Sequence, residues 1–157
     1  MEGKALKVRN VVFYVLIVLF AMVVASLGER LVNVPFVVTA VLAIVFGLLG
    51  IVLVVLAARL RGPRIQKIFF ILTGVSAACM PIFAVLHNLV YGLLIVLFGE
   101  GFWEGRTGGG DEAFFFILAI LVCPALFLIG TVGSIVLLVK ARTARHADVT
   151  PPDDAAD

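Results

Sequence analysis

Four long stretches without a charged residue constrain what this chain can fold into. They cover residues 10–28, 31–58, 68–99 and 113–139 and contain 19, 28, 32 and 27 residues. An apolar stretch of about 18 residues is long enough to cross the hydrocarbon core of a bilayer as a helix. Backbone amides find no water in that core, so such segments satisfy their hydrogen bonds internally, as helices. We therefore expect an all-α membrane protein with an antiparallel bundle of four transmembrane helices.

The composition excludes a soluble domain and a transmembrane barrel. Hydrophobic residues make up 63% of the chain and charged residues only 14%, which is far from the balance of soluble proteins. The strands of a barrel alternate apolar and polar residues over about ten positions, whereas these stretches are apolar on every face. The basic residues flank the stretches, so we expect no nucleic-acid partner.

Ten of the twelve basic residues lie on one side of the predicted bundle. They are Lys4, Lys7 and Arg9 before the first stretch, Arg59, Arg61, Arg64 and Lys67 between the second and third, and Lys140, Arg142 and Arg145 after the fourth. The other two connections contain Arg30 and Arg106 beside five acidic residues. Because loops rich in Lys and Arg stay in the cytoplasm, we expect both termini there, in a multi-pass protein of the plasma membrane.

Charged and turn-forming residues set the predicted boundaries. They give a cytoplasmic N-terminal segment 1–9, a transmembrane domain 10–139 with spans at 10–28, 34–58, 68–98 and 113–139, a cytoplasmic turn 59–67, a glycine-rich outer loop 99–112 and a disordered cytoplasmic tail 140–157. In an alternative interpretation the first span is a cleaved signal peptide, because a basic start precedes an apolar core. That core is longer than the usual 7 to 15 residues, and its loss leaves three spans.

The third stretch is longer than a bilayer requires. Its 32 residues form a helix of roughly 48 Å, against a hydrocarbon core of about 30 Å. The residues in excess of the bilayer thickness begin near Tyr91 and include Phe98. Two further aromatic residues, Phe102 and Trp103, follow the span. Either the third and fourth spans form a tilted hairpin with an aromatic belt at the outer interface, or the excess residues project or lie on the surface and another subunit covers them.

Small residues recur four positions apart in three of the spans. The pairs are Ala43 with Gly47, Gly74 with Ala78, and Gly130 with Ser134. This spacing lets two helix backbones approach closely in lipid. We expect these pairs to pack inside the bundle rather than between copies of the chain.

Polar residues of the third span form the candidate binding or pathway site. Thr73, Ser76, His87 and Tyr91 fall within about 60° of one helical line, with Asn88 at its margin. Polar groups inside hydrocarbon are costly without partners, and His87 is the titratable one. The structural alternative is that His87 bonds a carbonyl or a facing hydroxyl at the outer rim.

Neither a cofactor nor a metal site is expected. A membrane haem needs a set of axial ligands, and this chain has one histidine within a span, His87. Cys79 and Cys123 lie at similar predicted depths and face one another in one interpretation. We expect them to act as small buried hydrophobic residues, because hydrocarbon provides neither a low thiol pKa nor access for an oxidant.

The sequence contains no motif of a known catalytic centre, and no Asp, Glu, Lys or Arg falls inside a predicted span. We therefore expect a non-enzymatic accessory, assembly or scaffold subunit. Its partners would be the lipid bilayer and either another membrane protein or a second copy, bound through the third and fourth spans. The main alternative is a small homo-oligomeric channel or carrier lined by the polar residues of the third span, and a membrane enzyme or redox subunit is the less favoured one.

Overall fold

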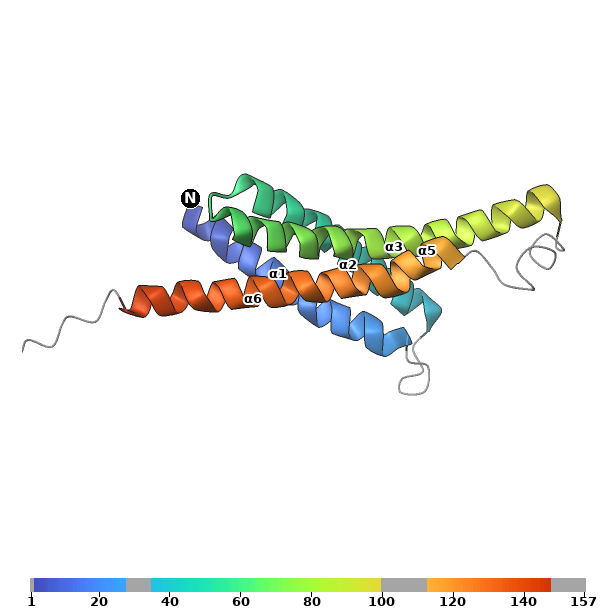
Figure 1. Ribbon diagram of the computed structural model, residues 1–157. Helices are drawn as coiled ribbons and strands as arrows, with labels where there is room; N and C mark the ends of the chain where they lie inside the picture. The colour runs from blue at the N-terminus through green and yellow to red at the C-terminus, as the bar shows by residue number, and fades with distance from the viewer. Residues whose placement is uncertain (1, 28–34, 100–112, 148–157) are drawn as a thin grey trace, which may run out of the picture.

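The computed structural model describes residues 2–27, 35–99 and 113–147, and all regular structure in these ranges is helical (Figure 1). The elements are α1 (Glu2–Leu27), α2 (Phe36–Arg59), α3 (Arg64–Phe98), α5 (Ala113–Ile117), the π-helix η1 (Leu118–Val122) and α6 (Cys123–Ala147). Four helical segments are long and apolar enough to cross a membrane: Gly3–Ser26, Phe36–Arg59, Arg64–Phe98 and Ala113–Ala144. The predicted helical class and the four membrane-spanning candidates are thereby confirmed.

The helices extend past the predicted spans at their basic ends. α1 begins at Glu2 and α3 at Arg64. α6 continues to Ala147, whereas the sequence analysis placed residues 140–147 in a disordered tail. Those residues are rich in Ala, Lys and Arg, which favour helix, and the prolines come only later in the sequence. The predicted outer loop after Gly99 and the tail from residue 148 onward lie outside the described residues.

Glycines bring the backbones of α2 and α3 together. A methyl group on Gly50 would lie 2.6 Å from the carbonyl oxygen of Gly74, and one on Gly74 would lie 2.7 Å from the carbonyl oxygen of Gly50. Gly47 makes room for the ring of Pro81, whose Cγ would be 2.7 Å from an added methyl. The prediction that Gly47 and Gly74 pack inside the bundle is confirmed.

A second face of α3 packs against α6 through another pair of glycines. A methyl group on Gly130 would lie 2.5 Å from Thr73 Oγ1, and one on Gly133 would overlap the ring of Phe69. Ser134 is fully buried on the same helix. α3 is therefore the central helix, with α2 and α6 in close contact with it.

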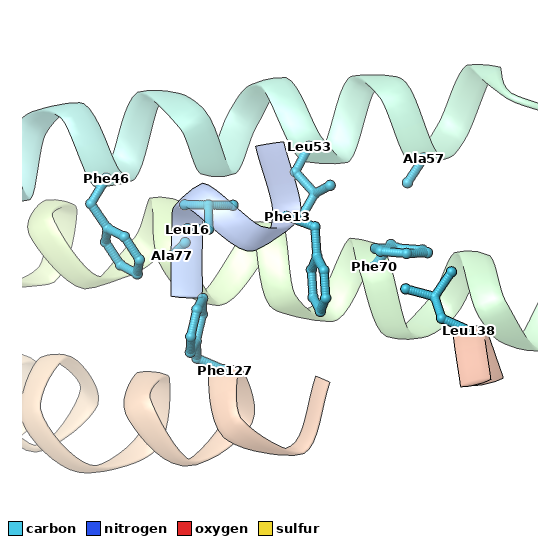
Figure 2. Close-up of a cluster of buried hydrophobic side chains, with 9 residues drawn as sticks. All are labelled: Phe13, Leu16, Phe46, Leu53, Ala57, Phe70, Ala77, Phe127 and Leu138. Carbon is cyan, nitrogen blue, oxygen red and sulfur yellow. The ribbon is translucent and has the colours of Figure 1, made fainter. Parts of the chain in front are cut away.

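Aromatic rings fill the space between α1 and the other helices (Figure 2). The Phe20 ring of α1 stacks on Phe127 of α6 at a centroid distance of 4.5 Å, and Phe46 of α2 lies 5.4 Å from Phe127. Nearer the basic end, Phe13 meets Phe70 of α3 edge to face at 5.1 Å. Since lipid tails are as apolar as these rings, the fit of the rings to one another, rather than burial from water, stabilises this packing.

The Gly50 contact leads to a stability prediction. Gly50→Ala is expected to destabilise the protein by about 1–3 kcal/mol, because the methyl group meets backbone atoms of α3 that have no flexible side chain to move. Thermal unfolding of the purified chain in detergent, followed by circular dichroism, measures the loss.

Gly92→Ala is the matched control for that prediction. Gly92 also lies in an apolar helix, but nothing is within 4 Å of a methyl group built on it. We expect this variant to unfold at the wild-type temperature or slightly above it, because alanine favours helix over glycine. Equal losses in the two variants would contradict a specific contact between α2 and α3.

Candidate functional site

The structure divides the predicted polar line on α3 into two parts. Thr73 and Ser76 are buried, His87 is partly buried, and Asn88 and Tyr91 are exposed. Thr73 lies against Gly130 of α6, and His87 and Asn88 lie beside α5 and η1. The five predicted residues are thus in two environments, so they do not form one continuous site.

Thr73 and Ser76 are bonded within their own helix. Thr73 Oγ1 donates to the carbonyl oxygen of Phe69 at 2.9 Å, and Ser76 Oγ donates to that of Leu72 at 2.8 Å. Gly130 of α6 packs so tightly on Thr73 that no additional methyl group fits. A solute passing along these hydroxyls would therefore have to separate α3 from α6.

His87 and Asn88 line a shallow groove of about 180 Å³ between α3 and the start of the last span. The lining residues are Ala84, His87, Asn88, Phe116, Ala119 and Ile120. The His87 ring centroid lies 5.5 Å from that of Phe116, and Asn88 Nδ2 donates to the Ala84 carbonyl oxygen at 2.8 Å. The surface that lines the groove is almost entirely apolar, so the groove suits an apolar group.

A π-helical turn, η1, forms one wall of this groove. Pro124 follows it, and proline has no amide hydrogen and clashes with the carbonyl four residues earlier in an α-helix. The wider turn accommodates this, because the Cys123 amide donates to the Leu118 carbonyl oxygen, five residues back. Single π-helical turns are frequent at functional sites, so this groove is one candidate site among the described residues.

Two buried hydroxyls on α6 did not feature in the predicted site. Thr131 Oγ1 and Ser134 Oγ are buried and have no hydrogen-bond partner within the described part of the chain. They lie on the helix face that also carries Phe127 and Leu138, at a helical spacing of three and four residues. That spacing is visible in the sequence, but it marks them only as residues of the packed face.

Arg9 is also buried, although the sequence analysis counted it only among the flanking charges. Only 5% of its surface is exposed, and its guanidinium carbon lies 4.3 Å from the Phe70 ring centroid. Its Nε and Nη2 both donate to Asn10 Oδ1, at 3.2 and 2.9 Å. The available sequence signal was its position four residues before Phe13, on the same face of α1.

The two cysteines lie in the third and fourth membrane-spanning candidates. Cys79 and Cys123 are free thiols, and they lie within electrostatic range of each other. Each is close in sequence to a proline of its own helix, Pro81 or Pro124. Within the described residues, no group of three or more His, Cys, Asp or Glu side chains is arranged to hold a metal ion.

No protein-family model matches the chain, and no curated protein or solved structure matches it either.

The unpaired hydroxyl of Thr131 gives a second prediction. Thr131→Val keeps the side-chain volume and removes a buried oxygen without a partner, so we expect the unfolding temperature to stay level or rise. Thr73→Val removes a formed hydrogen bond and should cost about 0.5–1.5 kcal/mol. Both variants are compared by thermal unfolding in the same detergent. A larger loss for Thr131→Val than for Thr73→Val would show that the Thr131 hydroxyl has a partner.

Proposed function

We propose that this chain is a non-enzymatic accessory, assembly or scaffold protein of the plasma membrane. In this proposal four helices form an antiparallel bundle, both termini are cytoplasmic, and the outer ends of α3 and of the last span bind another membrane protein. The observation that carries the proposal is the apolar end of α3, which extends past the other helices (Figure 1).

The length of α3 supports a partner at this end. Its 35 residues span roughly 52 Å, against about 30 Å of hydrocarbon. Val96 is 82% exposed, and Leu97 and Phe98 are also exposed. An upright α3 would leave these side chains outside the hydrocarbon core, where contact with water is unfavourable and a second apolar surface covers them.

α5 adds apolar surface next to this helix. Its Phe115 ring lies 6.1 Å from Phe83 of α3, while Phe114 and Phe116 are exposed. The groove at His87 lies along the same side. Together the end of α3, the exposed rings of α5 and the groove provide a surface that suits a hydrophobic transmembrane partner better than a polar soluble one.

Contacts between α2 and α3 support the antiparallel arrangement in the proposal. Gly47 meets Pro81, Gly50 meets Gly74, and Lys67 Nζ donates to the Ala58 carbonyl oxygen at 3.5 Å. Residue numbers therefore fall along α3 as they rise along α2. The short connection at Gly62 places Arg59, Arg61, Arg64 and Lys67 at one end of this pair, in agreement with a cytoplasmic turn.

The close packing of Thr73 against Gly130 of α6 weighs against the alternative of a channel or carrier with its path along the predicted polar line. A path of that kind would need polar groups free to replace the hydration of the solute, whereas the hydroxyls of Thr73 and Ser76 bond their own backbone. We therefore favour the scaffold.

The proposed topology is tested by labelling single cysteines in intact cells. In a chain with Cys79 and Cys123 replaced by alanine, Arg106→Cys should react with a membrane-impermeant maleimide. Lys4→Cys and Arg61→Cys should react only after the membrane is permeabilised, because basic segments remain in the cytoplasm. Labelling of Lys4→Cys in intact cells would overturn the assignment of the N-terminus.

The partner is tested by mild extraction from the native membrane and native mass spectrometry. We expect a different polypeptide in stoichiometric amount with the wild-type chain. Val96→Glu should remove it, because a carboxylate cannot enter an apolar interface without a partner.

Phe36→Glu is the matched control for the partner. Phe36 is 85% exposed at the start of α2, which the topology also places on the outer side. This variant should retain the polypeptide. A homo-oligomer with no second polypeptide, or equal retention by Val96→Glu, would contradict the proposed hetero-partner surface.

A further inference from the structure

Arg9 is a buried positive charge held in one orientation. The face of its guanidinium lies over Phe70, an arrangement in which the ring attracts the cation. One edge of the guanidinium, formed by Nε and Nη2, donates to Asn10 Oδ1. Face and edge are therefore both occupied, and three of the five N–H groups point away from Asn10.

The remaining part of the guanidinium reaches the surface. A nitrogen of Arg9 that was buried and had no hydrogen-bond partner would leave an unsatisfied donor inside the protein. Among the described residues only Thr131 Oγ1 and Ser134 Oγ are unsatisfied in this way, so no Arg9 nitrogen is. Since Asn10 bonds Nε and Nη2, the nitrogen that it leaves, Nη1, is accessible. The side chain thus has a buried stem and a small open tip that is already oriented.

The depth of Arg9 corresponds to the boundary between headgroups and hydrocarbon. Arg9 is seven residues after the start of α1, and the uninterrupted apolar sequence begins at Val11. Its neighbour Phe70 lies three residues after Lys67, the last charge of α3 before its apolar stretch. From this change from charged to apolar sequence we expect the guanidinium at the level where a bilayer presents phosphate groups.

Among the side chains that the structure describes, no carboxylate accompanies this charge. None of the described side chains, in residues 3–26, 35–99 and 113–144, is an Asp or a Glu. The basic side chains at the same end of the bundle make the surrounding potential positive, which attracts an anion. A planar guanidinium matches the geometry of phosphate oxygens.

We propose that Arg9 binds the phosphate of an anionic phospholipid at the basic end of the bundle. Phe70 and Asn10 orient the guanidinium, and Nη1 and the free hydrogen of Nη2 donate to the phosphate oxygens. A lipid fits better than the carboxylate of a partner protein. Lipid phosphates surround the protein on all sides at the depth expected for Arg9, whereas a partner would have to place a carboxylate at this one position.

The test measures lipid-dependent stability of the full chain in dodecyl maltoside. Dioleoyl phosphatidylglycerol is titrated into wild-type protein, and the unfolding temperature is followed by circular dichroism. We expect a saturable rise with phosphatidylglycerol and a much smaller one with dioleoyl phosphatidylcholine. Arg9→Gln should weaken the apparent affinity for phosphatidylglycerol about tenfold or more, because a charge-assisted hydrogen bond is lost.

Three further variants separate this site from general attraction to anionic lipid. Lys7→Gln changes an exposed charge two residues away on α1, and Arg64→Gln changes a charge that lines a separate groove of about 320 Å³ beside α6. Both should retain the phosphatidylglycerol response within about twofold, since diffuse surface charges contribute little individually. Arg9→Lys keeps the charge and should lie between wild type and Arg9→Gln, so the test remains valid if Arg9→Gln fails to fold.

Several results would overturn the proposal. An undiminished phosphatidylglycerol response in Arg9→Gln or Arg9→Lys would show that Arg9 only stabilises the contact between α1 and α3. An equal loss in Lys7→Gln or Arg64→Gln would indicate diffuse attraction. An equal rise with phosphatidylcholine, or with sodium phosphate at matched ionic strength, would show that an anionic lipid is not selected.

Discussion

The close approach of α2 and α3 at Gly50 and Gly74 is the contact on which the rest of this structure depends. Lipid tails are as apolar as the side chains of the helices, so burial of apolar surface contributes little free energy to helix association in a bilayer. Helices therefore associate where their backbones come close enough for extensive van der Waals contact. Two facing glycines provide that contact. With α2 fixed on one side and the Gly130 region of α6 on the other, α3 has one allowed position. The ring of Phe70 is then available to α1, and the groove at His87 is formed against η1.

The existence of four long helices was predictable because it follows from the length of apolar sequence and from the need of each backbone amide for a partner. The environment of individual polar residues could not be predicted from the sequence. Arg9 looks like an ordinary flanking charge in the sequence, and its burial depends on which face of α1 meets Phe70. The hydroxyls of Thr73 and Ser76 were predicted to belong to a binding or pathway site, and in the structure their acceptors are carbonyls of the same helix. That choice depends on side-chain rotamers and on the absence of space beside Gly130.

Several polar side chains of the described bundle make their contacts within the protein. Thr73, Ser76 and Asn88 each bond a carbonyl one turn earlier, and the Arg9 guanidinium lies between an aromatic ring and an amide. The two ends of α3 differ in character: the first is surrounded by cations, and the last is apolar and exposed. A helix of this kind orients a protein in the bilayer at one end and offers contact area at the other. This division fits a protein that holds others in place.

The π-helix η1 changes the direction in which the residues before it face. A π-helical turn holds one more residue than an α-helical turn, so the residues before it are rotated by about 100° relative to an uninterrupted α-helix. α5 and α6 therefore belong to one span but follow two different angular frames. Phe116 precedes the offset and faces His87, whereas Phe127 follows it and faces Phe20. A helical wheel drawn through the whole span would assign one of these rings to the wrong side. One extra residue lets a single span present separate faces to α3 and to α1.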